Sequence, residues 1–569
     1  MLVNAAISVN LRHAWVLLPE MVLAVWGIVI VLADLFLFRH RTPESRKNLT
    51  GRLSLFGIAL GLAAALIPIM VRFDLYGAQS YLNFAGLDIL AEPDPIIFFG
   101  AISADFLTEV FNFFYIILLA LVIRLSMAWS FTEEWGEYFA LLFWATVGMM
   151  ILTASEELIT LFVSLELMTI CLYLLTAFEK TRRRSPEGGL KYFVYGSVSS
   201  ALFLYGLSLI YGLTGTTQFA AMREALEGPQ SSFPGLVGNL AAATAILLML
   251  VGFGFKVGAV PFHQWVPDAY EGAPAGVTAW VSTGSKMASF VALMKVFSNA
   301  ILPLSSPHDN LQAPGWLGIV AVMAAVTMTF GNLAALPQRN LKRMLAYSSV
   351  AHAGYMLVGV AASCMARSRA EAAASVLFYL IVYSFANIGA FAVAAWLVRD
   401  KDTDEIEDLD GLARSSPGLA VCILILMLSL IGIPPLAGFF GKVAMFMEAL
   451  DQADHHSRII LVWLVGLGLL NSVISAFYYV RVLKAMYLRS PKDASLAPAG
   501  PAISVPILVG TAIVVMFGLM PGGLMDVMKS AAVSMLSSSG LKVASGPAPA
   551  DTKSPAPPAV PVAATLDSK

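Results

Sequence analysis

Long apolar segments separated by short polar loops run along nearly the whole chain, from about residue 15 to residue 523. An α-helix needs about 20 consecutive apolar residues to cross a hydrocarbon core about 30 Å thick, and most of these segments reach that length. Uninterrupted apolar stretches of this kind predict membrane helices. We therefore predict an all-α, polytopic membrane protein of about fourteen transmembrane helices. The predicted helices span residues 15–38, 51–72, 106–129, 137–154, 157–178, 190–213, 236–260, 275–297, 313–336, 342–362, 371–398, 417–447, 458–483 and 501–523.

The composition agrees with this pattern. Of the 569 residues, 58% are hydrophobic and 13% are charged, against about 25% charged residues in soluble domains. This excludes a soluble globular protein, and the expected surroundings are a lipid bilayer, with no nucleic acid as partner. The three cysteines, Cys171, Cys364 and Cys422, lie far apart without a CxxC motif or Cys/His pairing. This spacing argues against an iron–sulfur cluster or a zinc site.

The positions of the basic residues predict the orientation in the membrane. Most of the 35 Lys and Arg residues fall in the odd-numbered loops or at the helix ends beside them, such as Arg39 after the first helix and Lys180 after the fifth. Because positively charged loops tend to stay cytoplasmic, we predict a multi-pass protein of the cell inner membrane with both termini on the periplasmic side. The first apolar segment has no small-residue cleavage site after it, so we expect it to be retained.

A short internal repeat suggests how the chain is organised. The string GFGFKV at 252–257 recurs as GFFGKV at 438–443, and the same interval places Glu166 opposite His352. Many transporters consist of inverted repeats whose corresponding helices carry the ion sites. Since five helices per repeat is an odd number, the second repeat would enter the membrane from the opposite side. We predict helices 1–3 in residues 1–135, a first repeat in 136–298, a second repeat in 313–488, a last helix at 501–523 and a disordered Pro/Ala-rich tail at 537–569.

Two charged residues lie near the middle of predicted helices. Glu166 is central in LFVSLELMTICLYLL, and Lys286 is central in VSTGSKMASFVAL. A charge at that depth costs roughly 2.5–3.5 kcal/mol on insertion scales, and a central lysine cannot readily extend to the headgroups. These residues either form a buried ion pair that fixes helix packing or belong to an ion path.

Two further lysines stand beside helix-breaking residues. Lys256 precedes VGAVPFHQWVPD, and Lys442 follows IGIPPLAGFFG. Proline removes a backbone donor and leaves carbonyl groups free, and such irregular backbone is tolerated in hydrocarbon only where it is buried in protein or lines a hydrated cavity. Burial favours the neutral amine form of a lysine, whereas a nearby carboxylate favours its charged form. A broken helix that carries a lysine is therefore a candidate proton site.

Polar side chains between the two predicted repeats could connect these sites. His352 is the most informative of them, because imidazole titrates near neutral pH and can relay a proton, although a buried neutral histidine with a packing role is equally compatible with the sequence. The other polar residues are either interhelical hydrogen-bonding groups or water contacts. They are Tyr347, Ser348, Ser349, Tyr355, Tyr383, Ser384, Asn387, Asn471, Ser472 and Ser475.

Three long motifs resemble a known family. FGFKVGAVPFHQWVPDAYEGAPAGVTAWVSTGSKMASF, GNLAALPQRNLKRMLAYSSVAHAGYM and LSLIGIPPLAGFFGKVAMF are similar to the antiporter-like, proton-translocating membrane subunits of respiratory complex I, the NADH-quinone oxidoreductase. The resemblance covers about Gly136 to Leu488. Within that group the chain is most similar to subunit N, because it has lysine in both the eighth and the twelfth predicted helix and lacks the long lateral helix typical of subunit L.

The resemblance implies a role for each candidate residue. Glu166 and Lys256 would be the coupled pair, Lys286 the connecting residue and Lys442 the proton site of the second repeat. Lys191, in GGLKYFVYGSVSSALFLYG, matches a further family lysine near the cytoplasmic side, where it could also be a simple positive anchor. Protons would be the cargo and the other membrane subunits of complex I the partners. We expect no cofactor in this chain, because it has no Rossmann fingerprint or cluster ligand set; flavin and iron–sulfur clusters would belong to other subunits.

Three other interpretations of the sequence stay open. A subunit of a multisubunit cation/proton antiporter would share the fold and the glutamate–lysine pair. A membrane scaffold without transport activity would tolerate neutralisation of the buried charges. A substrate symporter is less compatible, because three intramembrane lysines match protons better than any evident small molecule.

Overall fold

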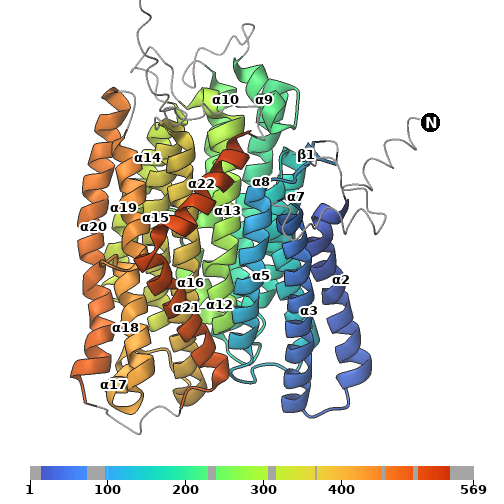
Figure 1. The fold of residues 1–569 in the computed structure, drawn as a ribbon, viewed down its shortest axis with the longest axis vertical. Helices are drawn as coiled ribbons and strands as arrows, with labels where there is room; N and C mark the ends of the chain where they lie inside the picture. Colours follow the sequence, from blue (N-terminus) through green and yellow to red (C-terminus); the bar gives the residue numbers. More distant parts are fainter. Residues whose placement is uncertain are drawn as a thin grey trace, which may run out of the picture.

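The structure is a bundle of long α-helices that run side by side (Figure 1). It is a computed structural model and describes residues 14–72, 96–98, 100–227, 239–305, 315–365, 368–451, 455–490 and 498–537. Within these residues the only strands are the short antiparallel pair β1 (Ile96–Ile97) and β2 (Ile102–Ser103). The predicted tail lies outside the described residues, apart from Ser537, which ends a helix.

Twelve helices among the described residues are long and apolar enough to cross a membrane. They include α2, which the π-helical turn Asp34–Phe38 extends. The twelve are α2 (Leu18–Ala33), α3 (Pro43–Arg72), α5 (Phe106–Ser126), α6 (Trp135–Ala154), α7 (Leu158–Thr176), α8 (Arg184–Thr214), α10 (Leu240–Val257), α14 (Trp316–Ala335), α15 (Leu341–Met365), α16 (Arg369–Lys401), α20 (His455–Leu488) and α21 (Pro501–Leu519).

Two predicted membrane helices are each divided into two shorter ones. The eighth consists of α12 (Ala275–Ser282) and α13 (Gly284–Lys295), and the twelfth consists of α18 (Pro417–Ile431) and α19 (Ala437–Leu450). Counting each pair as one crossing would bring the total to the fourteen that the sequence predicts. The all-α membrane fold is confirmed, while the exact count of helices stays a prediction.

The remaining helices are short connectors, with one longer helix at the C-terminal end. The connectors are the 3-10 helices Ala14–Leu17, Leu302–Leu304 and Ile406–Leu409, the π-helical turn Val296–Ala300, α9 (Phe219–Glu227), α11 (Trp265–Gly272) and α17 (Leu412–Ser415). The longer helix is α22 (Pro521–Ser537).

Several helices begin at a side chain that caps the first turn. Asp105 accepts a hydrogen bond from the backbone N–H of Thr108, Glu157 from that of Thr160, and Asn239 from those of Ala241 and Ala242. Each cap satisfies a backbone donor that has no partner within the helix. These caps fix the start of α5, α7 and α10.

The breaks in α10 and α18 have the same local cause. Each helix ends at a glycine in the left-handed region, Gly258 with φ 75° and Gly432 with φ 94°. That conformation is accessible to glycine because it has no Cβ. Pro261 and Pro435 follow three residues later, so neither helix can simply continue. The predicted breaks near Lys256 and Lys442 are confirmed, whereas the break at Thr283 in the Lys286 helix was not predicted from the sequence.

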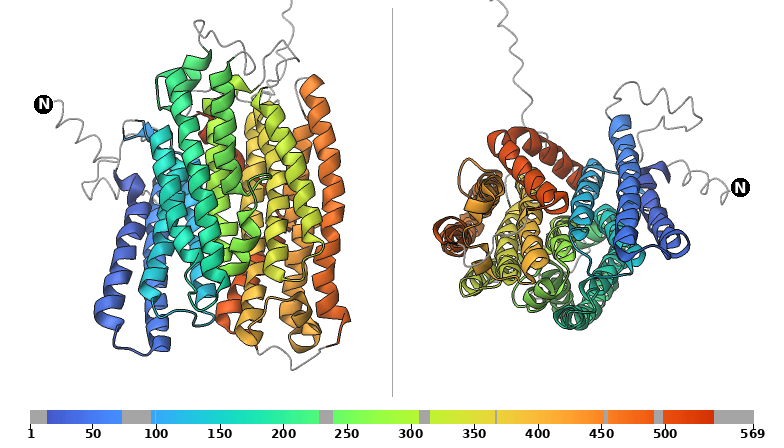
Figure 2. Two further views of the ribbon diagram at one scale, coloured as in Figure 1. Left: turned by 180° about the vertical axis from the view of Figure 1, so that it is seen from behind. Right: turned by 90° about the horizontal axis from the view of Figure 1, so that it is seen from below.

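The helices differ in how deeply they are packed. α16 is buried along its whole membrane-spanning length at the centre of the bundle. α2 and α3 lie at one edge and α20 at the opposite edge (Figure 2). Outer helices expose large apolar side chains, for example Phe36 at 72% and Trp463 at 77%. This is the pattern expected when lipid covers the outer surface.

The C-terminal end of the fold differs from the sequence prediction. The predicted last helix ends at residue 523, but ordered helix continues to Ser537 after an interruption at Met520. α22 lies obliquely across the bundle (Figure 1) and packs on α16 and α5. α22 was not predicted because it is amphipathic, with Asp526 and Lys529 on its outer side, and so is not a uniformly apolar segment. Its inner face buries Leu524, Met528, Ala531, Ala532, Met535 and Leu536.

Candidate functional site

The interior of the bundle holds the candidate residues on five different helices. Glu166 lies on α7, Lys256 at the end of α10, Lys286 on α13, His352 on α15 and Lys442 on α19. All except the partly exposed Glu166 are buried. The fold therefore brings residues from both predicted repeats into one interior region.

Glu166 and Lys256 form a loose ion pair. The Lys256 Nζ lies 3.8 Å from the Glu166 Oε1 and donates a hydrogen bond of 2.8 Å to the Thr169 hydroxyl. The Ser200 hydroxyl donates to the same Glu166 oxygen at 2.6 Å. Because each charge also has a hydroxyl partner, the ammonium and the carboxylate can move apart without losing every hydrogen bond. The pair therefore supplies both partners of a contact that can form and break.

The two members of this pair differ in exposure. The Lys256 side chain is 2% exposed, whereas the Glu166 side chain is 25% exposed. The Lys256 Nζ also lies 5.5 Å from the centre of the Phe255 ring and 5.9 Å from that of Tyr173. Aromatic faces stabilise a cation without supplying a proton acceptor. Glu166 is thus the partly exposed member of the pair and Lys256 the buried one.

Lys286 binds neutral oxygen atoms. Its Nζ donates to the Ser349 carbonyl oxygen at 2.6 Å and to the Ser349 hydroxyl at 2.5 Å, and it lies 5.6 Å from the centre of the Tyr383 ring. Within the part of the chain that the structure describes, no carboxylate lies within 4 Å of this ammonium group. A lysine with neutral acceptors keeps suitable partners whether or not it carries the extra proton.

His352 lies between two tyrosines that the sequence analysis missed. Its Nδ1 is 2.7 Å from the Tyr379 hydroxyl and its Nε2 is 3.3 Å from the Tyr479 hydroxyl. The Tyr479 hydroxyl also contacts that of Ser348. Both imidazole nitrogens therefore have a partner that can donate or accept. Tyr379 precedes the predicted Tyr383 by four residues, so helical spacing could have identified it.

Lys442 binds the backbone that the broken helix leaves free. Its Nζ donates to the carbonyl oxygens of Leu430 at 3.1 Å and Ile431 at 2.9 Å, at the end of α18. These carbonyls have no partner within their own helix because α18 ends at Gly432. The ammonium group also lies 4.8 Å from the centre of the Tyr355 ring. The break thus creates the lysine site directly.

One face of α15 connects the two lysine sites of the second half. Ser349 contacts Lys286, His352 follows three residues later, and Tyr355, three residues further on, contacts Lys442. Residues three apart lie on the same face of a helix. α15 therefore places a hydroxyl, an imidazole and a phenol in a row between Lys286 and Lys442.

A further polar cluster near Lys442 was only partly predicted. Asn332 donates to the Tyr355 hydroxyl at 2.9 Å and to the Asn471 side-chain oxygen at 3.3 Å, and it accepts from the Tyr478 hydroxyl at 3.0 Å. Tyr355 and Asn471 were candidates from the sequence, whereas Asn332 and Tyr478 were not. Neither residue has a local sequence signal that distinguishes it from an ordinary packing residue.

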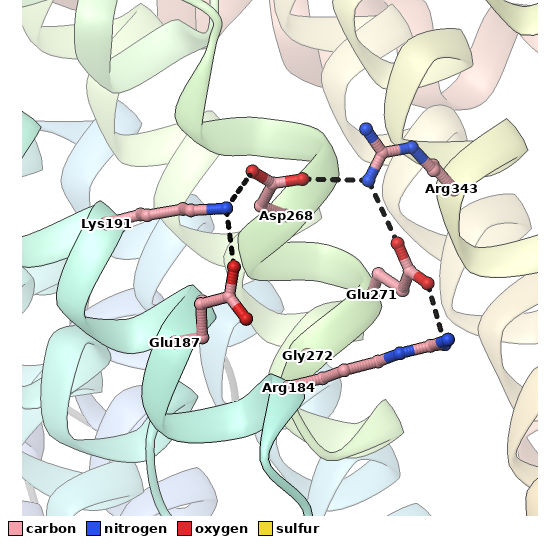
Figure 3. Close-up of a pocket in the computed structure, with 8 residues that line it drawn as sticks. Arg184, Glu187, Lys191, Asp268, Glu271, Gly272 and Arg343 are labelled. Atoms are coloured by element: carbon pink, nitrogen blue, oxygen red, sulfur yellow. Dashed lines mark hydrogen bonds and ion pairs between the residues drawn. The ribbon is translucent and has the colours of Figure 1, made fainter.

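Lys191 lies apart from these residues, at the end of the bundle where α8 begins. Its Nζ is 2.8 Å from Asp268 and 2.9 Å from Glu187 (Figure 3). Burial would raise the pKa of Asp268, but hydrogen bonds from Lys191 and Arg343 outweigh it and leave the pKa below its usual value. The charged residues surround a cavity of about 220 Å³.

A second buried ion pair lies near the other end of the bundle. The Lys295 Nζ is 2.9 Å from both the Glu156 Oε1 and the Ser103 hydroxyl. This contact joins α13 to the connection between α6 and α7 and to strand β2. The sequence analysis did not identify it, because Glu156 and Lys295 lie at or near the ends of predicted helices, where a charge is less unusual than at the centre.

Comparison with known proteins identifies the family. Residues 155–475 match the family described as NADH:quinone oxidoreductase/Mrp antiporter, transmembrane. Subunit N of NADH-quinone oxidoreductase from Moorella thermoacetica is 39% identical over 488 residues, covering 84% of this chain and 96% of that protein. Its counterpart from Myxococcus xanthus is 36% identical over 546 residues, covering 90% and 96%.

Solved structures agree with this assignment. A chain of respiratory complex I from Thermus thermophilus with bound aureothin is 31% identical, with a TM-score of 0.68, covering 89% of this chain and 98% of that chain. A chain of the Mrp complex from a Dietzia species has a TM-score of 0.72 at 19% identity, which shows the shared fold alone. On the strength of the sequence identity and the coverage of both proteins, the chain belongs to the subunit N family of NADH-quinone oxidoreductase.

Proposed function

We propose that Glu166, Lys256, Lys286 and Lys442, with His352 as a relay, carry protons across the membrane as this subunit's share of NADH-quinone oxidoreductase activity. In this proposal Glu166 and Lys256 load and release a proton as their ion pair forms and breaks. Lys286 passes charge to the second half, and Lys442 releases it. Lys191 lies near the side from which protons are taken up.

The observation that carries this proposal is the placement of three buried lysines among exchangeable partners. Lys256 has a carboxylate at 3.8 Å, while Lys286 and Lys442 have hydroxyl and carbonyl acceptors. Each charge buried in a membrane costs roughly 2.5–3.5 kcal/mol on insertion scales. Lys256 beside Glu166, together with Lys286 and Lys442 at the two ends of the polar face of α15, is better explained by proton transfer than by packing.

The predicted partners and location belong to the same proposal. The chain would assemble with the other membrane subunits of the complex in the cell inner membrane, with both termini on the periplasmic side. Electron transfer from NADH to quinone would occur in other subunits, which would hold the flavin and the iron–sulfur clusters. This subunit would couple that electron transfer to proton movement.

A cation/proton antiporter subunit is the second candidate. The fold neighbour in the Mrp complex favours the shared architecture and nothing more specific, because its identity to this chain is 19%. The relatives at 36–39% identity named above are subunits N, which favours the respiratory complex.

A native gel stained for NADH dehydrogenase activity distinguishes the two candidates. Membranes from a strain with an affinity-tagged chain should show the chain migrating with an NADH-oxidising, flavin-containing complex. Vesicles from the same strain should acidify on NADH addition. Migration with cation-antiporter subunits, or acidification that depends on Na⁺ and not on NADH, would contradict the proposal.

A further inference from the structure

The short helix α11 touches the surroundings of both Lys256 and Lys286. At its first residue, the Trp265 indole N–H donates to the Phe255 carbonyl oxygen at 3.0 Å, next to Lys256 in the chain. Near its other end, the Tyr270 hydroxyl lies 3.4 Å from the Ser349 hydroxyl, which also contacts Lys286. Five residues of helix span about 7.5 Å. A rigid movement of α11 must therefore change the contacts beside both Lys256 and Lys286.

The contact of α11 with α8 is close and largely fixed. The Trp265 ring stacks on Tyr192 with centres 4.1 Å apart and planes 7° apart. A Cβ on Gly188 would lie 2.7 Å from the Asp268 carbonyl oxygen, so the two backbones approach as closely as glycine permits. Lys191 adds an ion pair to Asp268 on the same side. α11 is thus anchored on α8.

The contact of α11 with α15 includes side-chain ion pairs beside hydrogen bonds from α15 to backbone carbonyls at the end of α11. Arg343, near the start of α15, lies 2.8 Å from the second Asp268 oxygen (Figure 3). Asp268 therefore bridges a cation of the first predicted repeat and a cation of the second. Both cations have another carboxylate within reach, because Lys191 also pairs with Glu187 and Arg343 with Glu271, each at 2.9 Å.

These alternative partners make the bridge easy to open. If the Asp268 side chain turned away, Lys191 would keep Glu187 on α8, and Arg343 would keep Glu271 on α11. The three side chains are 30–40% exposed, so water competes with their ion pairs. The adjoining cavity of about 220 Å³ is polar and large enough for water to solvate the separated groups.

We propose that Asp268 is a positioning residue that couples the two halves of the subunit, by binding Arg343 of α15 in one state and leaving Arg343 to Glu271 in another. Opening of the bridge lets α11 tilt about the remaining Glu271–Arg343 contact, which alters the Tyr270–Ser349 contact and with it the surroundings of Lys286. A change at Lys256 thereby reaches the second half. This inference rests on the proposed proton path.

The test compares Asp268→Asn, Arg343→Gln and the double variant in vesicles that contain equal amounts of assembled complex. The measured quantity is the number of protons taken up per electron transferred. Each single variant should lower this ratio, and the double variant should be no worse than the more impaired single, because both remove the same bridge. Asp268→Glu, which keeps the charge, should restore part of the ratio. Glu134→Gln is the control, since its exposed ion pair with Lys180 involves neither α11 nor α15.

Two outcomes would overturn the proposal. One is a wild-type proton-to-electron ratio in Asp268→Asn, and the other is a loss in the double variant equal to the product of the single losses. A purely structural role would lower the amount of complex without changing the ratio. Lys286→Ala, measured in parallel, separates the two hypotheses: normal pumping by Lys286→Ala contradicts the proton path itself, whereas impaired Lys286→Ala with normal Asp268→Asn contradicts only the coupling.

Discussion

The three central lysines differ chiefly in the groups that accept their hydrogen bonds. Lys256 has a carboxylate nearby, Lys286 has the two oxygens of a serine, and Lys442 has two carbonyls at a helix break. A carboxylate favours the charged form of a lysine, while neutral acceptors do so less strongly. At the residue scale, the charge of Lys256 is therefore the one that depends most on a movable partner.

Replacing Glu166 with Gln should reduce proton pumping, because Lys256 loses its counter-charge while the Ser200 hydrogen bond can remain. Glu166→Asp should retain part of the activity. Proton uptake by NADH-energised vesicles, normalised to complex content, measures the effect. Ser197→Ala is the control, because it removes a hydroxyl of the same helix that bonds to the Phe193 carbonyl and not to Glu166. Wild-type pumping in Glu166→Gln would rule out this role.

Replacing Lys442 tests whether a proton leaves that residue. Lys442→Ala removes the titratable group, and no carboxylate lies within 4 Å among the described residues, so no ion partner is left behind. The complex should assemble, with proton uptake and NADH-quinone activity falling together. Lys442→Arg keeps the charge but stays protonated, so it should also be impaired. Normal pH gradients with both variants, at equal complex content, would make Lys442 structural.

At the scale of whole helices, close contacts between glycines and the facing backbone set the distance between α14 and α15. A Cβ on Gly331 would lie 2.5 Å from the Ala351 nitrogen, and one on Gly354 would meet the Met328 backbone even more closely. Small residues allow membrane helices to approach in this way. Because α15 carries Ser349, His352 and Tyr355, this spacing also positions the polar row between the lysines.

Gly354→Ala should therefore destabilise the subunit, since overpacking in a tight interface costs about 1–3 kcal/mol. Gly212→Ala on α8 is the matched control, because a Cβ there has no heavy atom within 4 Å. The amount of assembled complex after mild heating measures the difference. Equal amounts of assembled complex for the two variants would show that α14 and α15 can separate without cost.

The C-terminal helix α22 gives a second prediction at this scale. Truncation after Met520 should reduce assembly, because it removes the buried face of α22 and the hydrogen bond from the Asn299 amide to the Met535 carbonyl. Truncation after about Gly540 should leave assembly and quinone reduction unchanged. Native gels of the two truncations compare them directly. Loss of the complex on truncation after about Gly540 would show that the tail binds a partner.

The arrangement of the whole molecule combines a buried polar interior with an apolar outer surface. The loops that carry most of the basic residues lie at one end, with α17, and α9 lies at the other end (Figure 1). If the positive end faces the cytoplasm, then the cavity around Asp268 and Lys191 opens to the side from which protons would be taken.

Cysteine labelling tests this orientation. Ser130→Cys, between α5 and α6, should react with a membrane-impermeant maleimide only after the cells are opened, whereas Ala225→Cys on α9 should react in intact cells with a permeable outer membrane. Both positions are exposed, while the native cysteines are buried or half-buried. Labelling after denaturation controls for masking by other subunits. The reverse pattern would invert the predicted topology.

The sequence by itself determined most of the helices and the residues worth testing. Apolar segments of about 20 residues specify membrane helices locally, and Glu166, Lys256, Lys286 and Lys442 stand out because a charge is expensive there. The breaks beside Lys256 and Lys442 also follow from local proline and glycine chemistry. The interruption at Thr283 and the amphipathic α22 had no comparably strong local signal.

Only the tertiary structure decided which groups meet. Thr169 as a partner of Lys256, Tyr379 and Tyr479 around His352, and Asp268 between Lys191 and Arg343 all join distant parts of the chain. The register of the repeat is a further example: the string match pairs Lys256 with Lys442, whereas the two left-handed glycines and the prolines after them align at a different interval. The sequence periodicity shows which face of a helix is polar, but only the packing of the helices determines which neighbouring helix that face contacts.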